Sequence, residues 1–358
     1  MEKIAIFGFG VIGSGVYELI EKAQLVKAKV TRVFDRIEKK DIIGATFSTD
    51  IEEITMSSEV DTVIECLGGV SLPYQIITKA LSRGKNVITS NKEVVSLFLG
   101  EFTALAKENK VKFLFEASVG GGIPIIKNLC NLIKHDTINA IYGVLNGTSN
   151  YILTEMFNNN KKMQEAILSA QQLGYAEADP NADLEGLDMV RKIAILTMLV
   201  ADKKVELTNI RHMGITNITE EFINVLKKED KVCKLVASSK SCGDYNQIII
   251  EPVVISKNNI LSNINGAYNG IAIDCQYNGK LMFYGLGAGK YATASAIISD
   301  LTDLINDANY IDYHEDGLLR INNEELGTYY IIRDGKISLV KKATNADLAS
   351  ASFYAKII

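Results

Sequence analysis

The feature that most constrains the fold of this chain is a glycine pattern directly after its first predicted strand. The stretch "KIAIFGFGVIGSG" runs from an apolar strand into Gly8, Gly10 and Gly13, spaced G-x-G-x-x-G, and then into a helical pattern. In such a unit the first glycine permits a tight turn, the second lets the backbone approach a pyrophosphate, and the third lets the helix pack on the strand. The helix N-terminus then offers N–H groups and a positive dipole end to phosphates.

An acidic residue at the end of the second predicted strand strengthens this interpretation. Asp35 closes "KVTRVFD", about 20 residues after the last glycine, where a ribose ligand is expected. An acid there favours NAD because it accepts hydrogen bonds from ribose hydroxyls, whereas Arg36 can face the 2′-phosphate of NADP. Lys39 and Lys40 follow and are equally consistent with solvated side chains. The sequence therefore predicts a dinucleotide site and leaves the choice between NAD and NADP open.

Strand and helix patterns alternate through the first third of the chain, which predicts an α/β fold with a Rossmann-like parallel sheet. The later strand candidates "QIIIEPVVI", "GIAIDCQYNG" and "KLMFYGLGAG" predict a second, α+β domain. We expect a nucleotide-binding domain over 1–128 and a second domain over 129–289. The helical pattern within 290–312 is expected to pack back on the first domain. Residues 313–358 are expected to form a short tail with a hairpin turning at "RDGK".

Composition excludes several function classes. The net charge of −5 provides no basic surface for nucleic acid, and no apolar run approaches the ~20 residues of a membrane span. The N-terminus enters a strand pattern at once, without a secretory leader pattern. Five cysteines without paired spacing fit reduced thiols. These observations predict a cytoplasmic protein that binds a small molecule.

The stretch "GYAEADPNADLEGLDMVRKIAIL" gathers carboxylates in front of an apolar helical segment. Asp188 and Lys192, four residues apart, are expected on one face of that helix. An ordinary surface ion pair at this spacing contributes only ~0.2–0.5 kcal/mol. The pair instead opens an apolar segment, and a positioned lysine can donate a proton to a developing oxyanion. Asp183, just upstream, is a candidate either for substrate contact or for capping the helix.

Six stretches, in this order, resemble the homoserine dehydrogenase family: "GFGVIGSG", "TSNKE", "EASVGGGIP", "NGTSNYIL", "LGYAEADPNADLEGLDMVRK" and "FYGLGAGKYATASA". They span residues 1 to about 307. The resemblance implies a Rossmann-like domain, a second α+β domain for substrate and dimerisation, and a homodimer. It also implies reversible NAD(P)-linked reduction of L-aspartate 4-semialdehyde to L-homoserine, in threonine and methionine biosynthesis.

The resemblance also implies roles for single residues. Lys192 matches the proton donor, with Lys92 beside it and Asp188 orienting the lysine or holding substrate. The implied substrate-binding residues are Glu177, Asp188, Tyr175, Thr148 and Asp183. The implied cofactor-binding residues are Gly8, Gly10, Val11, Ile12, Gly13, Asp35, Arg36, Asn91, Lys92 and Gly287. A monovalent cation such as Na⁺ is implied at Glu116, Val119, Gly121 and Ile123; a plain strand-to-helix turn is the alternative there.

Two departures and two alternatives accompany the resemblance. The residues after 307 show no complete βαββαβ pattern, so no amino-acid-sensing ACT domain is expected and L-threonine should not regulate this chain. Ala292 stands where the family usually has proline. The first alternative is a dehydrogenase of a related amino acid, which the presence of both Lys92 and Lys192 argues against. The second is a non-catalytic nucleotide-sensing paralogue, which loss of Lys192 or Asp188 would have marked.

Overall fold

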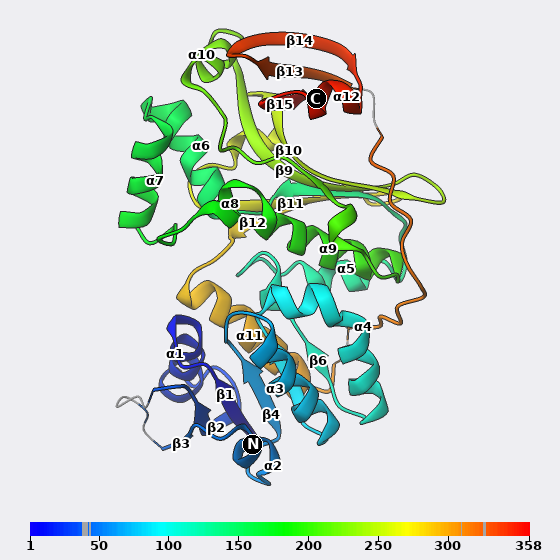
Figure 1. The fold of residues 1–358 in the computed structure, drawn as a ribbon. Helices are drawn as coiled ribbons and strands as arrows, with labels where there is room; N and C mark the ends of the chain where they lie inside the picture. Colours follow the sequence, from blue (N-terminus) through cyan, green and yellow to red (C-terminus); the bar gives the residue numbers. More distant parts are fainter. Residues whose placement is uncertain (38–41, 43, 309, 325–326) are drawn as a thin grey trace. The chain divides into compact units, whose positions relative to one another are not determined.

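The computed structural model describes residues 1–37, 42, 44–308, 310–324 and 327–358, so Lys39 and Lys40 lie outside the described residues. The chain forms two compact units (Figure 1). The first comprises 1–135, 198–204 and 288–317, and the second comprises 136–197, 205–287 and 318–358. The first unit therefore extends beyond the expected residue 128 and recruits two later segments of the chain.

The first unit is built on a parallel sheet of six strands in the order β3-β2-β1-β4-β5-β6. Its central strand β1 is apolar and buried from Ile4 to Phe7, because a sheet covered on both faces has no polar side. The sheet confirms the predicted Rossmann-like topology. Its strands are β1 (Glu2–Phe7), β2 (Ala28–Phe34), β3 (Thr46–Ser48), β4 (Thr62–Glu65), β5 (Asn86–Thr89) and β6 (Phe113–Leu114).

The helices α1 to α4 lie between strands of this sheet, as parallel strands require crossover connections. The helices and helical turns of the first unit are α1 (Val11–Tyr17), a π-helical turn (Glu18–Lys22), α2 (Ile51–Met56), α3 (Ser71–Ser82), α4 (Lys92–Glu108), a 3₁₀ turn (Glu116–Ser118), α5 (Ile126–Leu132) and α11 (Lys290–Ile305). The helical pattern expected from residue 290 onward is α11, which contacts α1. The helix α4 begins at Lys92 under a side-chain cap from Asn91.

The second unit is built on a mixed nine-stranded sheet in the order β12-β11-β7-β9-β10-β15-β13-β14, with β8 pairing with β10. The antiparallel pair β9–β10 is its longest, with eleven residues in each strand. The strands are β7 (Ile138–Val144), β8 (Arg211–His212), β9 (Lys231–Ser241), β10 (Asn246–Ser256), β11 (Tyr268–Cys275), β12 (Gly279–Leu286), β13 (Gly327–Arg333), β14 (Lys336–Ala343) and β15 (Phe353–Ile357).

The helices of the second unit include those that carry the polar motifs. They are α6 (Gly147–Asn159), α7 (Met163–Gln172), α8 (Asn181–Leu184), α9 (Leu187–Ala201), α10 (Glu220–Lys228) and α12 (Asn345–Ala349), with 3₁₀ turns at Leu207–Asn209 and Ile260–Asn263. Two short connections, at 145–146 and 185–186, lead into α6 and α9. They place the starts of both helices in one polar cluster, described below.

The C-terminal segment is not a separate tail. The hairpin of β13 and β14 turns at Asp334–Gly335, which confirms the expected turn. After α12, however, β15 runs parallel to β10 and joins the hairpin to the main sheet. Tyr329, Ile331 and Tyr354 bury their side chains in a core of their own. A hairpin alone buries too little apolar surface to be stable in water, so it needs this third strand and helix.

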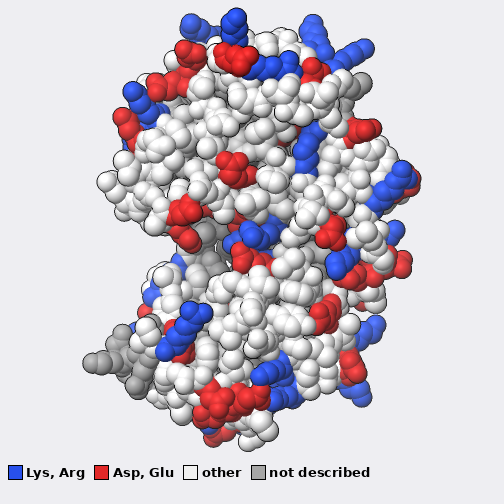
Figure 2. Space-filling model, viewed as in Figure 1, with Lys and Arg blue, Asp and Glu red and all other residues white. Residues whose placement is uncertain are grey.

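No helix among the described residues is long and apolar enough to cross a membrane. Acidic and basic side chains alternate over the face drawn in Figure 2, and no continuous basic surface forms there among the described residues.

Candidate active site

The glycine turn in the first unit has the geometry that its motif predicts. Gly8 has φ +96°, which side chains other than glycine rarely adopt. A Cβ on Gly13 would lie 1.9 Å from the Gly8 carbonyl oxygen, so the close packing of α1 on β1 requires glycine there. A Cβ on Gly10 would meet no atom within 4 Å. Gly13 therefore serves the fold, while Gly10 leaves open space at the N-terminus of α1.

Asp35 lies beside this turn. Its Oδ2 accepts the Phe9 N–H at 3.0 Å and its Oδ1 accepts the Arg36 N–H at 2.7 Å. The carboxylate is thus anchored at the carboxyl end of β2, next to the first turn of α1. Val11 and Arg36 are exposed and Ile12 is half-buried, so these predicted cofactor residues surround an open region of the first unit.

Asn91 and Lys92 stand at the start of α4, at the end of the neighbouring strand β5. The Asn91 side chain accepts the N–H groups of Glu93 and Val94, and so caps the helix that Lys92 begins. Lys92 belongs to the first unit and Lys192 to the second. Their predicted partnership remains a prediction, as does cofactor binding by Gly287, which belongs to the second unit.

The second unit buries the Asp188–Lys192 pair in the first turns of α9. The Lys192 Nζ lies 2.7 Å from Asp188 Oδ2 and donates to the Leu145 carbonyl at 2.7 Å. Both residues are less than one-tenth exposed. The predicted i, i+4 pairing is confirmed, but this is a buried pair rather than a surface one. Losing one partner of such a pair typically costs 3–5 kcal/mol, because a buried charge is left unpaired.

Asn146 joins this pair to a second carboxylate. Its side-chain amide donates to Asp188 Oδ2 at 3.0 Å and to Asp183 Oδ1 at 2.7 Å. Its carbonyl oxygen accepts the Ser149 N–H and caps α6. Burial, and secondly the charge of Asp188, raise the pKa of Asp183. Asp183 therefore faces the polar cluster.

Of the remaining predicted substrate residues, Thr148 lies in the first turn of α6, and Tyr175 and Glu177 lie on the segment before α8. The Thr148 hydroxyl is buried and donates to the Tyr175 carbonyl at 2.6 Å. The Tyr175 side chain is 46% exposed and packs on Tyr151, with ring centroids 5.1 Å apart. The Glu177 side chain is exposed. The structure thus brings Thr148, Asp183, Asp188 and Lys192 together, and leaves Glu177 at the surface of the same unit.

Sequence analysis missed two side chains of the cluster, Asn146 and Asn269. Asn146 stood in the quoted stretch "NGTSNYIL", so its motif was a signal. Asn269 lies in β11, is fully buried, and donates to the same Leu145 carbonyl as Lys192, at 2.8 Å. Its Oδ1 accepts no hydrogen bond in the described residues. No local pattern marks Asn269, because only the sheet brings β11 beside the end of β7.

The loop predicted to bind a cation has a different contact set for its glutamate. Both Glu116 carboxylate oxygens accept backbone N–H groups at the start of α5, from Ile126 and Lys127 at 2.8 Å each. Burial raises the pKa of this carboxyl group. Gly120 and Gly121 have positive φ, which redirects the backbone of the turn. No cluster of three His, Cys, Asp or Glu side chains suited to a metal occurs in the described residues.

Comparisons with known proteins agree over both units. A family model for the NAD-binding domain of homoserine dehydrogenase matches residues 8–116, and the homoserine dehydrogenase model matches residues 124–302. The homoserine dehydrogenase of Bacillus subtilis is 34% identical over 310 residues, which cover 84% of this chain and 72% of that protein.

Solved structures show the same arrangement. A homoserine dehydrogenase from Thiobacillus denitrificans superposes with a TM-score of 0.85 at 28% identity, over 93% of this chain and 84% of that one. A hyperthermophilic archaeal homoserine dehydrogenase mutant in complex with NADPH has a TM-score of 0.74 at 24% identity, over 87% of this chain and 99% of that one. At that identity the second likeness supports the fold alone.

Proposed function

Because the chain belongs to the homoserine dehydrogenase family, we propose that Asp188 and Lys192 move the proton in its NAD(P)-dependent interconversion of L-aspartate 4-semialdehyde and L-homoserine. This oxidoreductase activity on a CH–OH group belongs to threonine and methionine biosynthesis. The observation that carries the proposal is the buried ammonium of Lys192, held 2.7 Å from a carboxylate in a cluster of polar side chains.

Lys192 has the geometry of a general acid. Its ammonium carries three N–H donors, of which two are directed at Asp188 and the Leu145 carbonyl. The third is available for the substrate's reacting oxygen. The bound nicotinamide supplies the hydride in the direction of reduction and receives it in the direction of oxidation. As negative charge develops on the aldehyde oxygen, Lys192 stabilises it and donates a proton. In the reverse direction the neutral amine accepts the hydroxyl proton.

The two carboxylates, Asp188 and Asp183, have different proposed roles. Asp188, 2.7 Å from the Lys192 Nζ, fixes the direction of the lysine side chain. Asp183 shares the Asn146 amide with Asp188 and provides a second carboxylate, suited to the substrate's α-ammonium group. Thr148, Tyr175 and Glu177 lie on or beside the segment leading to α8. We assign them to the amino-acid end of the substrate.

The cofactor site is assigned to the glycine turn of the first unit. Gly10 and the N-terminus of α1 are suited to the pyrophosphate, and Asp35 to the adenosine ribose. The test is an assay of nicotinamide absorbance with L-homoserine, run in parallel with NAD and NADP. Turnover with either cofactor supports the function, and the ratio settles the choice that Asp35 and Arg36 leave open. Absence of turnover with both would contradict it.

A monovalent cation site is a separate proposal, and the residues fit it only in part. Both oxygens of the Glu116 carboxylate already cap α5. The proposal therefore rests on the main-chain carbonyls of the turn at Val119, Gly121 and Ile123, with Glu116 holding the turn in place. Dependence of the melting temperature on Na⁺ but not on a bulky organic cation at equal ionic strength would support it.

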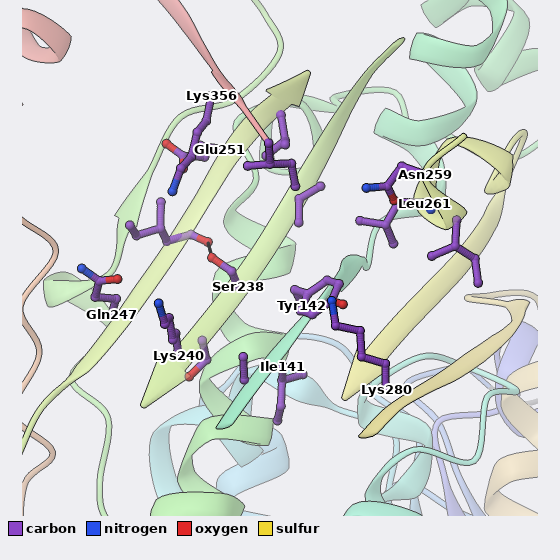
Figure 3. Close-up of a pocket in the computed structure, with 17 residues that line it drawn as sticks. Ile141, Tyr142, Ser238, Lys240, Gln247, Glu251, Asn259, Leu261, Lys280 and Lys356 are labelled. Atoms are coloured by element: carbon purple, nitrogen blue, oxygen red, sulfur yellow. Dashed lines mark hydrogen bonds between the residues drawn. The ribbon is translucent and has the colours of Figure 1, made fainter. Parts of the chain in front are cut away.

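A homodimer formed through the second unit is a further proposal. One face of the nine-stranded sheet has a hollow of about 510 Å³ with an apolar floor of Val236, Ile249 and Val253. In Figure 3, Tyr142 lies centrally in this hollow, with Lys240 and Lys280 at its sides. The edge strand β12, whose Lys280 lines the hollow, also carries exposed apolar side chains, since Tyr284 is 55% and Leu286 49% exposed. Contiguous apolar surface beside an unpaired edge strand is typical of an interface between copies.

The dimer has a direct test. Sedimentation equilibrium should give about twice the chain mass of 39.3 kDa. Tyr142→Glu, which puts a charge into the hollow, should yield monomer. Tyr277→Glu, at an exposed turn outside the hollow, should leave the dimer intact. A monomeric wild-type chain would contradict the proposal.

We also propose a cytoplasmic location. All five cysteines are free thiols, as is usual in a reducing compartment.

A further inference from the structure

A buried carboxyl group outside every motif lies at the centre of the first unit's sheet. Glu65 is the last residue of β4, is fully buried, and pairs with Phe7 at the end of β1. In the order β3-β2-β1-β4-β5-β6 the strand sequence reverses between β1 and β4. Open parallel sheets bind ligands outside the carboxyl ends of their strands at this switch point. Glu65 therefore lies at the base of the nucleotide site.

The contacts of Glu65 all use it as a hydrogen-bond acceptor. Its Oε1 accepts the Leu67 N–H at 2.6 Å, and its Oε2 accepts the Thr89 hydroxyl at 2.5 Å. An ionised carboxylate accepts at both oxygens, whereas protonation turns one oxygen into an O–H donor and forces one of these contacts to rearrange.

These donors belong to the two segments that border the glycine turn and Lys92. A Cβ on Gly8 would lie 2.9 Å from Leu67 Cδ2, so the loop after β4 packs directly against the turn. Asn91 also donates to the carbonyls of Leu67 and Gly69, at 3.2 and 2.8 Å, while its carbonyl oxygen caps the helix that begins at Lys92. One carboxylate thus connects both segments.

We propose that Glu65 is a positioning residue for the dinucleotide: its carboxylate holds the loop 66–69 and the first turn of α4 in the arrangement that receives the cofactor. The proposal rests on the dinucleotide site at the glycine turn. It assigns Glu65 no contact with the reacting atoms.

This arrangement is expected to depend on pH. Burial raises the pKa of Glu65 to about 7, and the hydrogen bonds from Thr89, Leu67 and Asn91 oppose that rise. Burial and the charge of Glu65 raise the pKa of the adjacent Cys66 thiol, which stays neutral.

The other elements around Glu65 contribute few titratable groups. β1 places Phe7 beside Glu65, β5 places Thr89, and the first turn of α4 carries Lys92 and Glu93. As the pH falls through about 7, Glu65 takes up a proton and one of its oxygens becomes a donor. One of its two contacts must then rearrange, so the loop and the helix start are held less firmly and cofactor binding weakens.

The experiment measures NADH binding to the full chain, without substrate, by the fluorescence of the nicotinamide between pH 6 and pH 8.5. For the wild type, the dissociation constant should rise as the pH falls through about 7. For Glu65→Gln it should be about tenfold higher at pH 8, the effect of losing one hydrogen bond to a charged group. The dissociation constant of the Glu65→Gln variant should also be nearly independent of pH. The control Glu101→Gln, at an exposed position of α4, should match the wild type.

A folded Glu65→Gln protein with wild-type affinity and the wild-type pH profile would overturn the inference. If Glu65→Gln does not fold, the pair Thr89→Ser and Thr89→Val decides. The serine, which keeps the hydroxyl donor, should bind as the wild type does, and the valine should bind more weakly; equal affinity would overturn the inference. The same titration is run with NADPH, and failure of the wild type to bind either NADH or NADPH at any pH would instead contradict the dinucleotide site itself.

Discussion

The candidate site of the first unit is formed mainly by backbone groups, and that of the second unit mainly by side chains. In the first unit the predicted cofactor site is mainly backbone: a turn at Gly8, open space at Gly10 and a helix N-terminus. In the second unit the site consists of buried charged and amide side chains around Lys192 and Asp188. Backbone sites tolerate most side-chain changes and fail when a side chain fills their space. Side-chain networks fail when one member is removed.

The largest expected effect comes from removing the lysine of the second unit. Lys192→Met should lower turnover by ~10²–10⁴-fold in both directions, because it removes the proton donor. NADH affinity should barely change, since the glycine turn belongs to the first unit. The measurements are steady-state kinetics and NADH titration.

Controls for this variant separate chemistry from folding. Lys161→Met removes a half-buried ion pair with Glu155 in the same unit, 2.7 Å long and outside the polar cluster, and should keep normal turnover. The double variant with Asp188→Asn and Lys192→Met leaves no unpaired buried charge, so it should fold even if the single variant does not. Near-normal turnover in a folded Lys192→Met protein would refute its assigned role.

Two glycines of the first unit should respond differently to the same change. Gly10→Val should fold normally, since a Cβ there meets no atom within 4 Å and φ is −82°. It should nevertheless weaken NADH binding by at least tenfold, because the side chain occupies the space left for the phosphates. Gly13→Val should destabilise the fold itself, since its Cβ would lie 1.9 Å from the Gly8 carbonyl oxygen.

Thermal unfolding and NADH titration separate the two outcomes. A Gly10→Val protein that is folded and binds NADH as the wild type does would remove the cofactor assignment. If both valine variants unfold, the distinction between a glycine that serves the ligand and one that serves the fold is wrong.

The second unit has a further buried charged residue outside its candidate site, Lys234. This residue is 3% exposed, and its ammonium donates to neutral oxygens of Asn150, Ile264 and Asn265. Burial lowers the pKa of Lys234 to about 8 from its ordinary 10.5. The unfolded chain therefore binds more protons than the folded one between about pH 8 and 10.5, so this group makes stability rise with pH in that window.

Denaturant unfolding at a series of pH values from 7.5 to 10 tests this effect. The contribution of Lys234 should amount to about 2 kcal/mol across the window. Lys234→Met should flatten the rise, whereas Lys240→Met, an exposed lysine on the same strand, should keep it. An unchanged slope in the Lys234 variant would contradict the assignment.

The smallest expected effect concerns regulation. The described residues after 317 supply β13, β14 and β15 to the sheet of the second unit and bury Tyr329 and Phe353 completely. Millimolar L-threonine should therefore leave the activity of this chain almost unchanged. Saturable inhibition that does not compete with L-homoserine would show that this segment also binds an effector.

Prediction from the sequence succeeded where the signal was local. The strand, the glycine turn and the acid around Gly8 and Asp35 are close in sequence. Each of these features depends on the backbone angles of only a few neighbouring residues. The i, i+4 relation of Asp188 and Lys192 is also local, because a helix fixes it.

Tertiary structure decided which of these residues meet. Asn269, Asn146 and the Leu145 carbonyl come together only because β11 pairs with β7 and because α6 and α9 start at one place. Glu65 gives no sequence signal, since its importance comes from burial at the point where β1 and β4 lie side by side. The sequence alone determined the nucleotide fold, the family resemblance and the helix that carries the Asp188–Lys192 pair. Burial makes Lys192 of the i, i+4 pair a candidate acid, and it makes Glu65 at the end of a strand a candidate switch. Burial depends on contacts between distant segments, which no local sequence pattern encodes.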